Sequence, residues 1–327
     1  MDLLHSSGVS STTYLQTHYS HSQGYFLLVS MATDLRNTFF LLFPIWFHVQ
    51  QAEAVKLVWV AVVGDWVNLM LKWLLFGERP YWWVQETGFY GNSSQPMIEQ
   101  FPMTCETGPG SPSAQPLLCV RVSLWTLFWC VQVCVCLSRV YVAAHFPHQV
   151  ITGVMIERYL SLDSMISSRP VLRSYVLTSI LLLSLALLLY LCLQLVGVNL
   201  LWSVEKAWRW CRRAEWVSVD TSPFASLFRN TGTLLGLGLG LHSPLYAHAH
   251  RTVVSRGADG ATYRVTCLSA TLLLLQLFDS AFQPPVHSGA LFYLLSFCKS
   301  AIVPLATVAI VPYCVTTGLG YKAEKLL

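Results

Sequence analysis

Charged residues are scarce in this chain. They make up 11% of its 327 residues, against about 25% in an average soluble domain. The 20 basic and 16 acidic residues leave a net charge of +4, which is too small an excess to indicate a nucleic-acid-binding surface. Hydrophobic residues make up 54% of the sequence, and the mean hydropathy is +0.52. These values exclude an ordinary soluble protein and predict a protein embedded in the lipid bilayer, with no nucleic-acid partner.

A cleavable signal peptide is also missing. Residues 1–24 are polar and lack a basic start followed by an apolar core, so the first apolar run must direct membrane insertion itself. A disulfide framework is not indicated either. Most of the ten cysteines lie inside apolar runs, where we expect small packing residues: Cys130, Cys134, Cys136, Cys192, Cys267, Cys298 and Cys314.

Long apolar runs are what the sequence has in abundance. A helix needs about 20 residues to cross a hydrocarbon core of about 30 Å. Candidate runs lie at residues 25–47, 57–76, 117–137, 175–198, 224–241, 263–278 and 291–315, with a weaker one at 150–156. Leucine-rich pieces favour helices, because the strands of a membrane barrel would alternate their apolar residues. We predict an all-α, polytopic transmembrane helical bundle of about seven to eight spans, forming one integral membrane domain over residues 1–327.

One glycosylation sequon bears on orientation. Asn92 is followed by Ser93 and Ser94 in the loop 81–115, the single Asn-x-Ser/Thr sequence of the chain. Glycosylation of Asn92 would place this loop on the luminal side of the endoplasmic reticulum. The alternative is an unmodified surface asparagine. Basic residues do not settle the orientation, since they occur in successive loops.

A basic stripe follows the second apolar run. Asp65, Lys72 and Arg79 are spaced by seven, so a continuous helix would place them on one face, and Gly77 and Pro80 mark its end. A lysine inside a membrane segment costs about 2.5–3.5 kcal/mol, so it faces a partner or a wet cavity. Lys72 either pairs with Asp65 while Arg79 reaches the interface, or it forms with Arg79 a clamp for an anion such as phosphate.

A second basic element contains a candidate nucleophile. Arg139 follows Ser138 directly, and His145 lies six residues further on. A neutral imidazole can attack phosphorus and hold the phosphoryl group covalently, while an arginine stabilises the charge that grows on the phosphoryl oxygens. The alternative is a histidine and an arginine that face lipid headgroups. We predict no metal site at His145 and His148, because no further ligand lies nearby.

These elements resemble three signatures of the acid phosphatase and haloperoxidase superfamily, in the same order. The matching residues are Lys72-x6-Arg79-Pro80, then Pro112-Ser113, then Ser138-Arg139-x5-His145. The flanking sequence resembles the glucose-6-phosphatase catalytic subunit family over nearly the whole chain, including the stretches FGERPYWW, FPMTCETGPGSPS and CLSRVYVAAHFPHQ.

The resemblance implies a multi-helical hydrolase of the endoplasmic reticulum membrane with a luminal active site. It would convert glucose 6-phosphate into glucose and phosphate through a phosphohistidine, without metal or cofactor, in the service of glucose production. Its partners would be the lipid bilayer and a glucose-6-phosphate transporter in the same membrane. By correspondence, the residues are His145 as nucleophile, Lys72, Arg79, Ser113 and Arg139 as phosphate-binding groups, and Asn92 as the glycosylation site.

The second signature departs from the family pattern. The family has Pro-Ser-Gly-His, whereas this chain has Pro112-Ser113-Ala114-Gln115. The missing histidine is the family's proton donor for the leaving sugar oxygen, and glutamine cannot give up a proton at neutral pH. General acid catalysis contributes about 10² to 10⁴ in rate, so we expect little or no activity.

The chain is also shorter than the family pattern near residues 114–116, where one whole helix is missing. With a single span between them, Arg79 and Arg139 would lie on opposite membrane faces, about 30 Å apart. No phosphate could then contact both. The alternative function is therefore a non-catalytic regulatory or splice-variant membrane protein of the same family.

Overall fold

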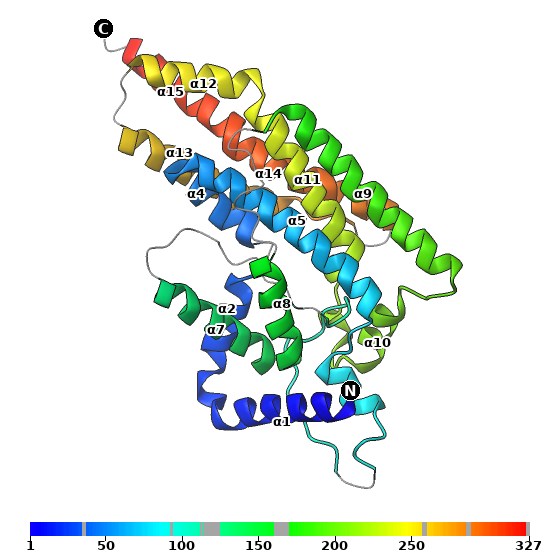
Figure 1. Cartoon of the computed structure of the whole chain (residues 1–327). Coiled ribbons are helices and arrows are strands. Elements are labelled where there is room, and N and C mark those ends of the chain that lie inside the picture. The colour runs from blue at the N-terminus through cyan, green and yellow to red at the C-terminus, as the bar shows by residue number, and fades with distance from the viewer. Residues whose placement is uncertain are drawn as a thin grey trace. The chain divides into compact units, whose positions relative to one another are not determined.

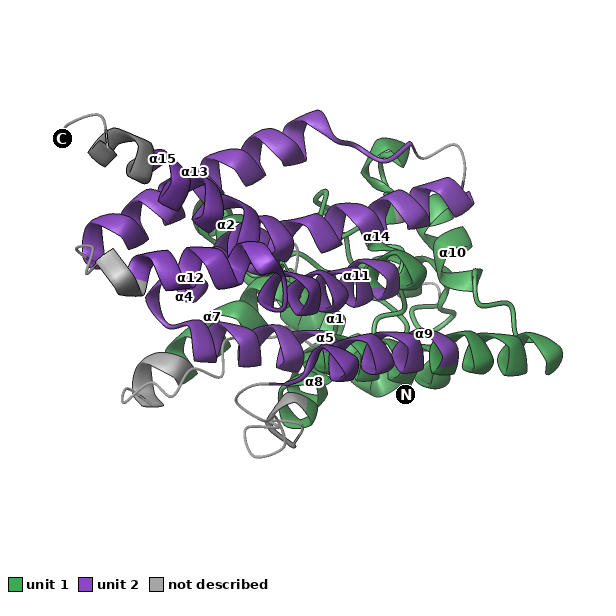
Figure 2. Ribbon diagram, turned by 90° about the horizontal axis from the view of Figure 1, so that it is seen from above, with its two compact units in different colours: residues 1–35, 63–161, 185–226 green, residues 36–62, 162–184, 227–327 purple. Residues whose placement is uncertain are grey.

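The computed structural model describes residues 1–34, 37–91, 94–111, 113, 125–159, 170–256, 260–285 and 289–324. Helices and their connecting loops make up this described part, without a strand, which confirms the all-α prediction. The chain divides into two compact units (Figure 2). Unit 1 comprises residues 1–35, 63–161 and 185–226, and unit 2 comprises residues 36–62, 162–184 and 227–327. The single domain over residues 1–327 stays a prediction.

Four helical segments are long and apolar enough to cross a membrane, which supports the prediction of a membrane protein. They are Gln51–Glu86, Leu172–Leu195, Gly260–Ala281 and Gly289–Gly318. The first contains α5 (Gln51–Leu75) and α6 (Pro80–Glu86), the second is α9, the third is α13, and the fourth runs from α14 (Gly289–Leu305) into α15 (Val311–Glu324). The total of seven to eight spans stays a prediction.

The run at 25–47 was expected to form one span, and this expectation is wrong. Helix α2 (Gln23–Ala32) ends before the polar pair Thr33-Asp34. A wide helical turn (Thr38–Leu42) then leads into α4 (Phe43–Val49). The remaining predicted runs are helical where they are described, as α7 (Trp125–Tyr141), α8 (Pro147–Tyr159) and α11 (Pro223–Leu241).

Unit 1 is organised around α7. This helix packs against α1 (Asp2–His18), α2 and α8, while α6 packs against α1 and α10 (Trp202–Trp210) (Figure 1). The polar N-terminal segment is therefore part of the fold. Its helix buries one face at His5, Val9, Thr12 and Gln16, residues three or four positions apart. Short 3-10 turns at Ser20–Ser22, Ala214–Trp216 and Val219–Thr221 complete the unit.

An aromatic core holds α6 in place within unit 1. Trp82 is fully buried, Trp83 is nearly so, and both pack in one cluster with Phe146 and Val9. Arg79 directly precedes this helix, and Phe146 directly follows His145. The burial of these rings therefore fixes two of the candidate site residues through their neighbours in the chain.

Unit 2 contains α4, α12 (Pro244–Arg256), α13, α14, a wide turn (Ala306–Ile310), α15 and most of α11. Two glycines let α11 approach α14 closely. A side chain at Gly232 would overlap the carbonyl oxygen of Phe297, and one at Gly236 would overlap that of Ala301. Small residues at such spacing are typical of helix contacts in membranes, where close packing replaces the hydrophobic effect.

Candidate active site

Arg79 lies outside the helix that carries Lys72. Helix α5 ends at Leu75, Phe76 has a left-handed φ of +48°, and Arg79 is extended at the start of α6. The expectation that one helix carries the whole basic stripe is therefore wrong. The predicted end of the helix at Gly77 and Pro80 is confirmed, because the residue before a proline prefers extended backbone.

The guanidinium group of Arg79 is almost completely buried and joins two distant segments. Its Nε donates to the Gly108 carbonyl at 2.7 Å, and its Nη1 donates to the Ala144 carbonyl at 2.9 Å. Its Nη2 forms an ion pair with Oε2 of Glu106 at 3.1 Å. Arg79 thus connects the glycine-rich loop (residues 105–113) to the residues that precede His145.

Arg139 lies in the last turn of α7 and is buried. Its Nη1 donates to Ser30 Oγ at 3.1 Å, and its Nη2 pairs with Glu106 Oε1 at 2.5 Å. The same Nη2 lies 3.3 Å from Nε2 of His145. Arg139 Nε is buried and has no hydrogen-bond partner among the described residues.

The partners of His145 define which ring nitrogen carries the proton. Nδ1 lies 2.8 Å from the Gly110 carbonyl, which can only accept, so Nδ1 is the donor. Arg139 can only donate, so Nε2 offers its lone pair. Burial, followed by the charges of Arg79 and Arg139, holds the pKa of His145 well below its ordinary value of 6.5. The ring is therefore neutral at physiological pH, with the lone pair of Nε2 directed at Arg139.

Glu106 is the residue that the sequence interpretation missed. Its carboxylate contacts Arg79 and Arg139, and its Oε2 lies 3.8 Å from Nε2 of His145. Burial raises the pKa of this carboxyl group, but the charges of Arg139 and Arg79 outweigh burial and hold the pKa well below its ordinary value of 4.5. Lys72 adds to this lowering. The available signal was a carboxylate inside the glycine-rich loop, between the two basic signatures.

Two glycines allow the loops of the site to touch. Gly110 N donates to the Gly77 carbonyl at 2.7 Å. A Cβ atom on Gly77 would overlap the backbone and side chain of Ser111, and one on Gly110 would overlap the Glu78 carbonyl oxygen. Glycine is therefore required at both positions for the glycine-rich loop to lie against the segment that carries Arg79.

Gln149 is a second residue that the sequence interpretation missed. It lies in the first turn of α8, and its Nε2 donates to the Glu78 carbonyl at 2.7 Å. Its Oε1 accepts from Phe146 N at 3.0 Å, and its own carbonyl accepts from Ser113 N at 3.2 Å. One glutamine thus holds together the three segments that carry Arg79, His145 and the glycine-rich loop.

Ser113 is buried at the end of the described loop, and its Oγ has no hydrogen-bond partner among the described residues. Lys72 lies three positions before the end of α5, and its charge lowers the pKa of His145 as well as that of Glu106. The predicted positions Gln115 and Asn92 lie outside the described residues.

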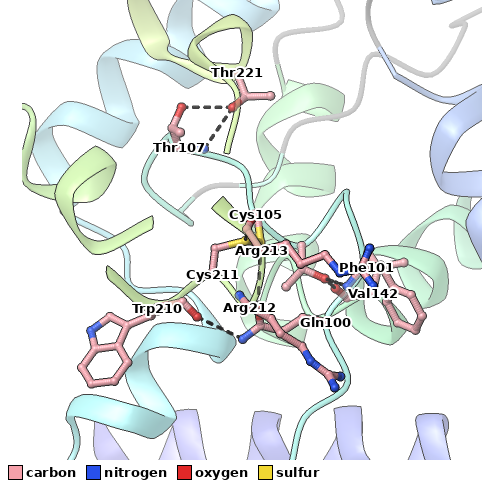
Figure 3. The surroundings of a disulfide bond; sticks show 11 residues. Gln100, Phe101, Cys105, Thr107, Val142, Trp210, Cys211, Arg212, Arg213 and Thr221 are labelled. Atoms are coloured by element: carbon pink, nitrogen blue, oxygen red, sulfur yellow. Dashed lines mark hydrogen bonds between the residues drawn. A yellow bond between two sulfur atoms is a disulfide. The ribbon is translucent and has the colours of Figure 1, made fainter. Parts of the chain in front are cut away.

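A disulfide joins Cys105 to Cys211, which corrects the expectation that the chain has no disulfide framework (Figure 3). Both cysteines lie in polar segments, whereas the seven described cysteines of the apolar runs are free. The Gln100 side chain joins the same two segments, since it donates to the Trp210 carbonyl and accepts from Arg212 N at 2.8 Å. The glycine-rich loop is therefore fixed to the segment after α10.

Thr107 adds a second attachment, because its main-chain N donates to Thr221 Oγ1 at 3.0 Å (Figure 3). Thr104 Oγ1 donates to the Val142 carbonyl at 2.5 Å and so ties the start of the same region to the chain between Arg139 and His145. Ala143, in that stretch, has a left-handed φ of +54°. Such backbone conformations persist where the surroundings over-determine them, as they do here.

The two basic signatures converge, contrary to the expectation that they lie on opposite membrane faces. Arg79 and Arg139 both contact the Glu106 carboxylate. The expectation rested on one full crossing by the run at 117–137, of which residues 117–124 lie outside the described part of the chain. The described helix of that run, α7, has 17 residues and is not among the candidate spans found in the described residues.

The fold and the site define a class: a helical membrane protein with a buried cluster of two arginines, a glutamate and a neutral histidine. Comparison with curated proteins then identifies the family. The chain is 48% identical to "Glucose-6-phosphatase catalytic subunit 1" of Felis catus and of Mus musculus over 359 positions, covering 100% of this chain and 99% of each relative. It is 42% identical to "Glucose-6-phosphatase 2" of Homo sapiens over 360 positions, covering 99% of both chains. The chain therefore belongs to the glucose-6-phosphatase catalytic subunit family.

These alignments are longer than the chain. The first covers 359 positions against 327 residues, so the relative has about 32 residues that this chain lacks. No family model and no solved structure matches the chain.

Proposed function

We propose that this chain is a hydrolase of glucose 6-phosphate that acts through a phosphohistidine on Nε2 of His145. The observation that carries the proposal is the convergence of Arg79 and Arg139 on the Glu106 carboxylate, with Arg139 also beside the unprotonated Nε2 of His145. The relatives are named for this activity. The buried Oγ of Ser113 and the buried Nε of Arg139, neither with a hydrogen-bond partner among the described residues, support a further ligand at the site.

The reaction has two displacements. Lys72, Arg79, Arg139 and Ser113 bind the phosphoryl oxygens and stabilise the charge that develops on them. Nε2 of His145 attacks phosphorus, the bond from phosphorus to the sugar oxygen breaks, and glucose leaves after its oxygen takes up a proton. Water then attacks phosphorus, the nitrogen–phosphorus bond breaks, and phosphate leaves while the imidazole returns to its neutral form.

The proton for the leaving sugar oxygen is the weak point of this chain. Gln115 stands where the family signature has a histidine, and its amide does not release a proton at neutral pH. Water has to supply the proton instead. We expect turnover about 10² to 10⁴ below that of a full-length relative.

The site is proposed to face the lumen of the endoplasmic reticulum. The disulfide between Cys105 and Cys211 supports this placement, because disulfides persist in oxidising compartments such as this lumen. Glycosylation of Asn92, in the same loop region, would agree with it. The chain would then cross the membrane seven to eight times, with its site on the side away from cytosolic substrate. A glucose-6-phosphate transporter would deliver the substrate to that side.

The test is phosphate release from glucose 6-phosphate by the full chain in proteoliposomes. A full-length relative sets the upper rate, and His145→Ala sets the background. We expect slow release that is above the background. Release no faster than that of His145→Ala would refute the hydrolase.

A second function is favoured by the glutamine at position 115. The chain would bind phosphate esters without turning them over, as a regulatory or splice-variant member of the family. Binding of a phosphate analogue that is lost in Arg79→Ala, together with no turnover, is the result expected of this function. Absence of any binding excludes it.

A further inference from the structure

We propose that the carboxylate of Glu106 is an internal anion that occupies the phosphoryl subsite when the site is empty, and that it competes with entering and leaving phosphate. The inference rests on the proposed function for the position of the phosphoryl group. It assigns to Glu106 a role that none of the three signatures supplies.

The position of the carboxylate carries the first step. Oε1 lies 2.5 Å from Arg139 Nη2, and Oε2 lies 3.1 Å from Arg79 Nη2. Oε2 also lies 3.8 Å from Nε2 of His145, the nitrogen that attacks phosphorus. A phosphoryl group in reach of this nitrogen and both arginines has to stand where the carboxylate now stands. The two anions therefore exclude each other.

Burial indicates which member of the cluster moves. The side chains of Arg79, Arg139 and His145 are 1%, 4% and 2% exposed, whereas that of Glu106 is 22% exposed. The three buried groups are also held by bonds to Gly108, Ala144, Ser30 and Gly110. Among the described residues, the Glu106 carboxylate contacts only Arg79, Arg139 and His145. Glu106 can turn towards solvent while the groups that bind phosphate stay in place.

Charge explains why an exchange of this kind is useful. Buried cations without a counter-charge destabilise the empty site, and Glu106 supplies that charge. A phosphate dianion displaces the carboxylate because it brings more charge and more acceptor oxygens to the same arginines. After hydrolysis, the returning carboxylate competes with product phosphate and promotes its release.

A purely structural role makes the opposite prediction. If Glu106 only positioned Arg79 and Arg139, its removal would let both side chains relax and would weaken phosphate binding. An internal competitor, once removed, leaves the subsite open, so phosphate binds more tightly. The sign of the change in affinity separates the two roles.

The experiment is titration of the purified full chain in detergent with orthophosphate, followed by calorimetry and thermal unfolding. For Glu106→Gln we expect a lower thermal unfolding midpoint without phosphate. We also expect a phosphate Kd at least about tenfold lower than in the native chain, and a larger rise of the unfolding midpoint on phosphate binding. An unchanged or higher Kd overturns the proposal.

Glu78→Gln is the matched control. It removes a carboxylate that pairs with Lys206 at 2.8 Å, outside the arginine pair. Its phosphate Kd should match that of the native chain, and a drop equal to that of Glu106→Gln would show a general charge effect and overturn the proposal. If Glu106→Gln does not fold, Glu106→Asp keeps the charge but shortens its reach. It should lower the phosphate Kd by a smaller factor, and an unchanged or raised Kd counts against the proposal.

Orthophosphate binding needs no turnover, so the two proposals fail separately. A chain that shows the expected tightening but releases no phosphate from glucose 6-phosphate lacks the hydrolase function and keeps the internal anion. A chain that hydrolyses the substrate but binds phosphate no more tightly after Glu106→Gln is a hydrolase without this competitor.

Discussion

Nη2 of Arg139 lies 3.3 Å from Nε2 of His145, while Nδ1 of the same ring donates to the Gly110 carbonyl at 2.8 Å. The two contacts leave one assignment for the ring proton, because a guanidinium never accepts and a carbonyl never donates. The lone pair of His145 therefore faces Arg139, the cation proposed to bind the phosphoryl oxygens. Catalysis by nucleophilic histidine needs this arrangement before substrate arrives.

The first prediction is that glucose 6-phosphate labels His145 at Nε2 and not at Nδ1, because Nδ1 carries the proton and donates it in a hydrogen bond to the Gly110 carbonyl. Acid-free quenching followed by tandem mass spectrometry identifies the labelled residue, and phosphorus NMR distinguishes its two ring nitrogens. His145→Ala should carry no label, whereas His148→Ala, three residues along the same chain segment, should keep it. A phosphoryl group on Nδ1 of His145 would contradict the assignment.

The second prediction concerns Gly110. An alanine there would overlap the Glu78 carbonyl oxygen, so the glycine-rich loop must shift and the bond from His145 Nδ1 is lost. We expect Gly110→Ala to lower the free energy of unfolding by about 1–3 kcal/mol and to reduce phosphate binding. Thermal unfolding and orthophosphate titration measure both effects. Gly88→Ala, where a Cβ atom meets nothing within 4 Å, is the control and should change neither.

The sequence was sufficient for most of the helices and for three residues that meet in the cluster, Arg79, Arg139 and His145. Leucine-rich runs predict α9, α13 and α14 because a helix satisfies its own backbone within a bilayer, and the runs lack the alternation of barrel strands. Local signals at Gly77 and Pro80 predict the end of the helix before Arg79. These features depend on residues that are neighbours in the chain, and neighbours are what a sequence displays directly.

The convergence of the site could not be obtained in the same way. Counting apolar runs assigned one crossing between Arg79 and Arg139, and this crossing would have separated them. Glu106 and Gln149 were missed because their roles exist only after distant segments meet. Cys105 and Cys211 carried a signal that was not used: they lie in polar segments, apart from the cysteines of the apolar runs.

The third prediction concerns the disulfide. Cys211→Ser releases the glycine-rich loop from the segment after α10, across a sequence separation of 106 residues. We expect a loss of about 2–4 kcal/mol of stability and weaker phosphate binding. Thermal unfolding of the native chain and of Cys211→Ser, each with and without reductant, measures the loss of stability. Cys192→Ser, at an exposed free cysteine of α9, should behave like the native chain. An equally stable Cys211→Ser variant would show that the threonine and glutamine contacts alone hold the loop.

The fourth prediction is a loss of stability in acid, and its sign follows from two groups whose pKa is lower in the folded chain than in the unfolded one. Burial, followed by the neighbouring arginines, lowers the pKa of His145 from 6.5. The arginines, against burial, lower the pKa of Glu106 from 4.5. In both cases the unfolded chain binds a proton that the folded chain does not, so stability falls as pH decreases, by up to about 1.4 kcal/mol per pH unit for each group.

The decline should begin near pH 6.5 and steepen below pH 4.5, where Glu106 joins His145. His5 and His148 contribute in the same direction, since burial lowers the pKa of both. Unfolding midpoints measured in detergent between pH 4 and pH 8 give the profile. His145→Gln should flatten its upper part and Glu106→Gln its lower part. An unfolding midpoint that stays constant from pH 7 to pH 5 would mean that His145 is not a neutral, buried imidazole in the folded chain. The proposed attack on phosphorus depends on that neutral form.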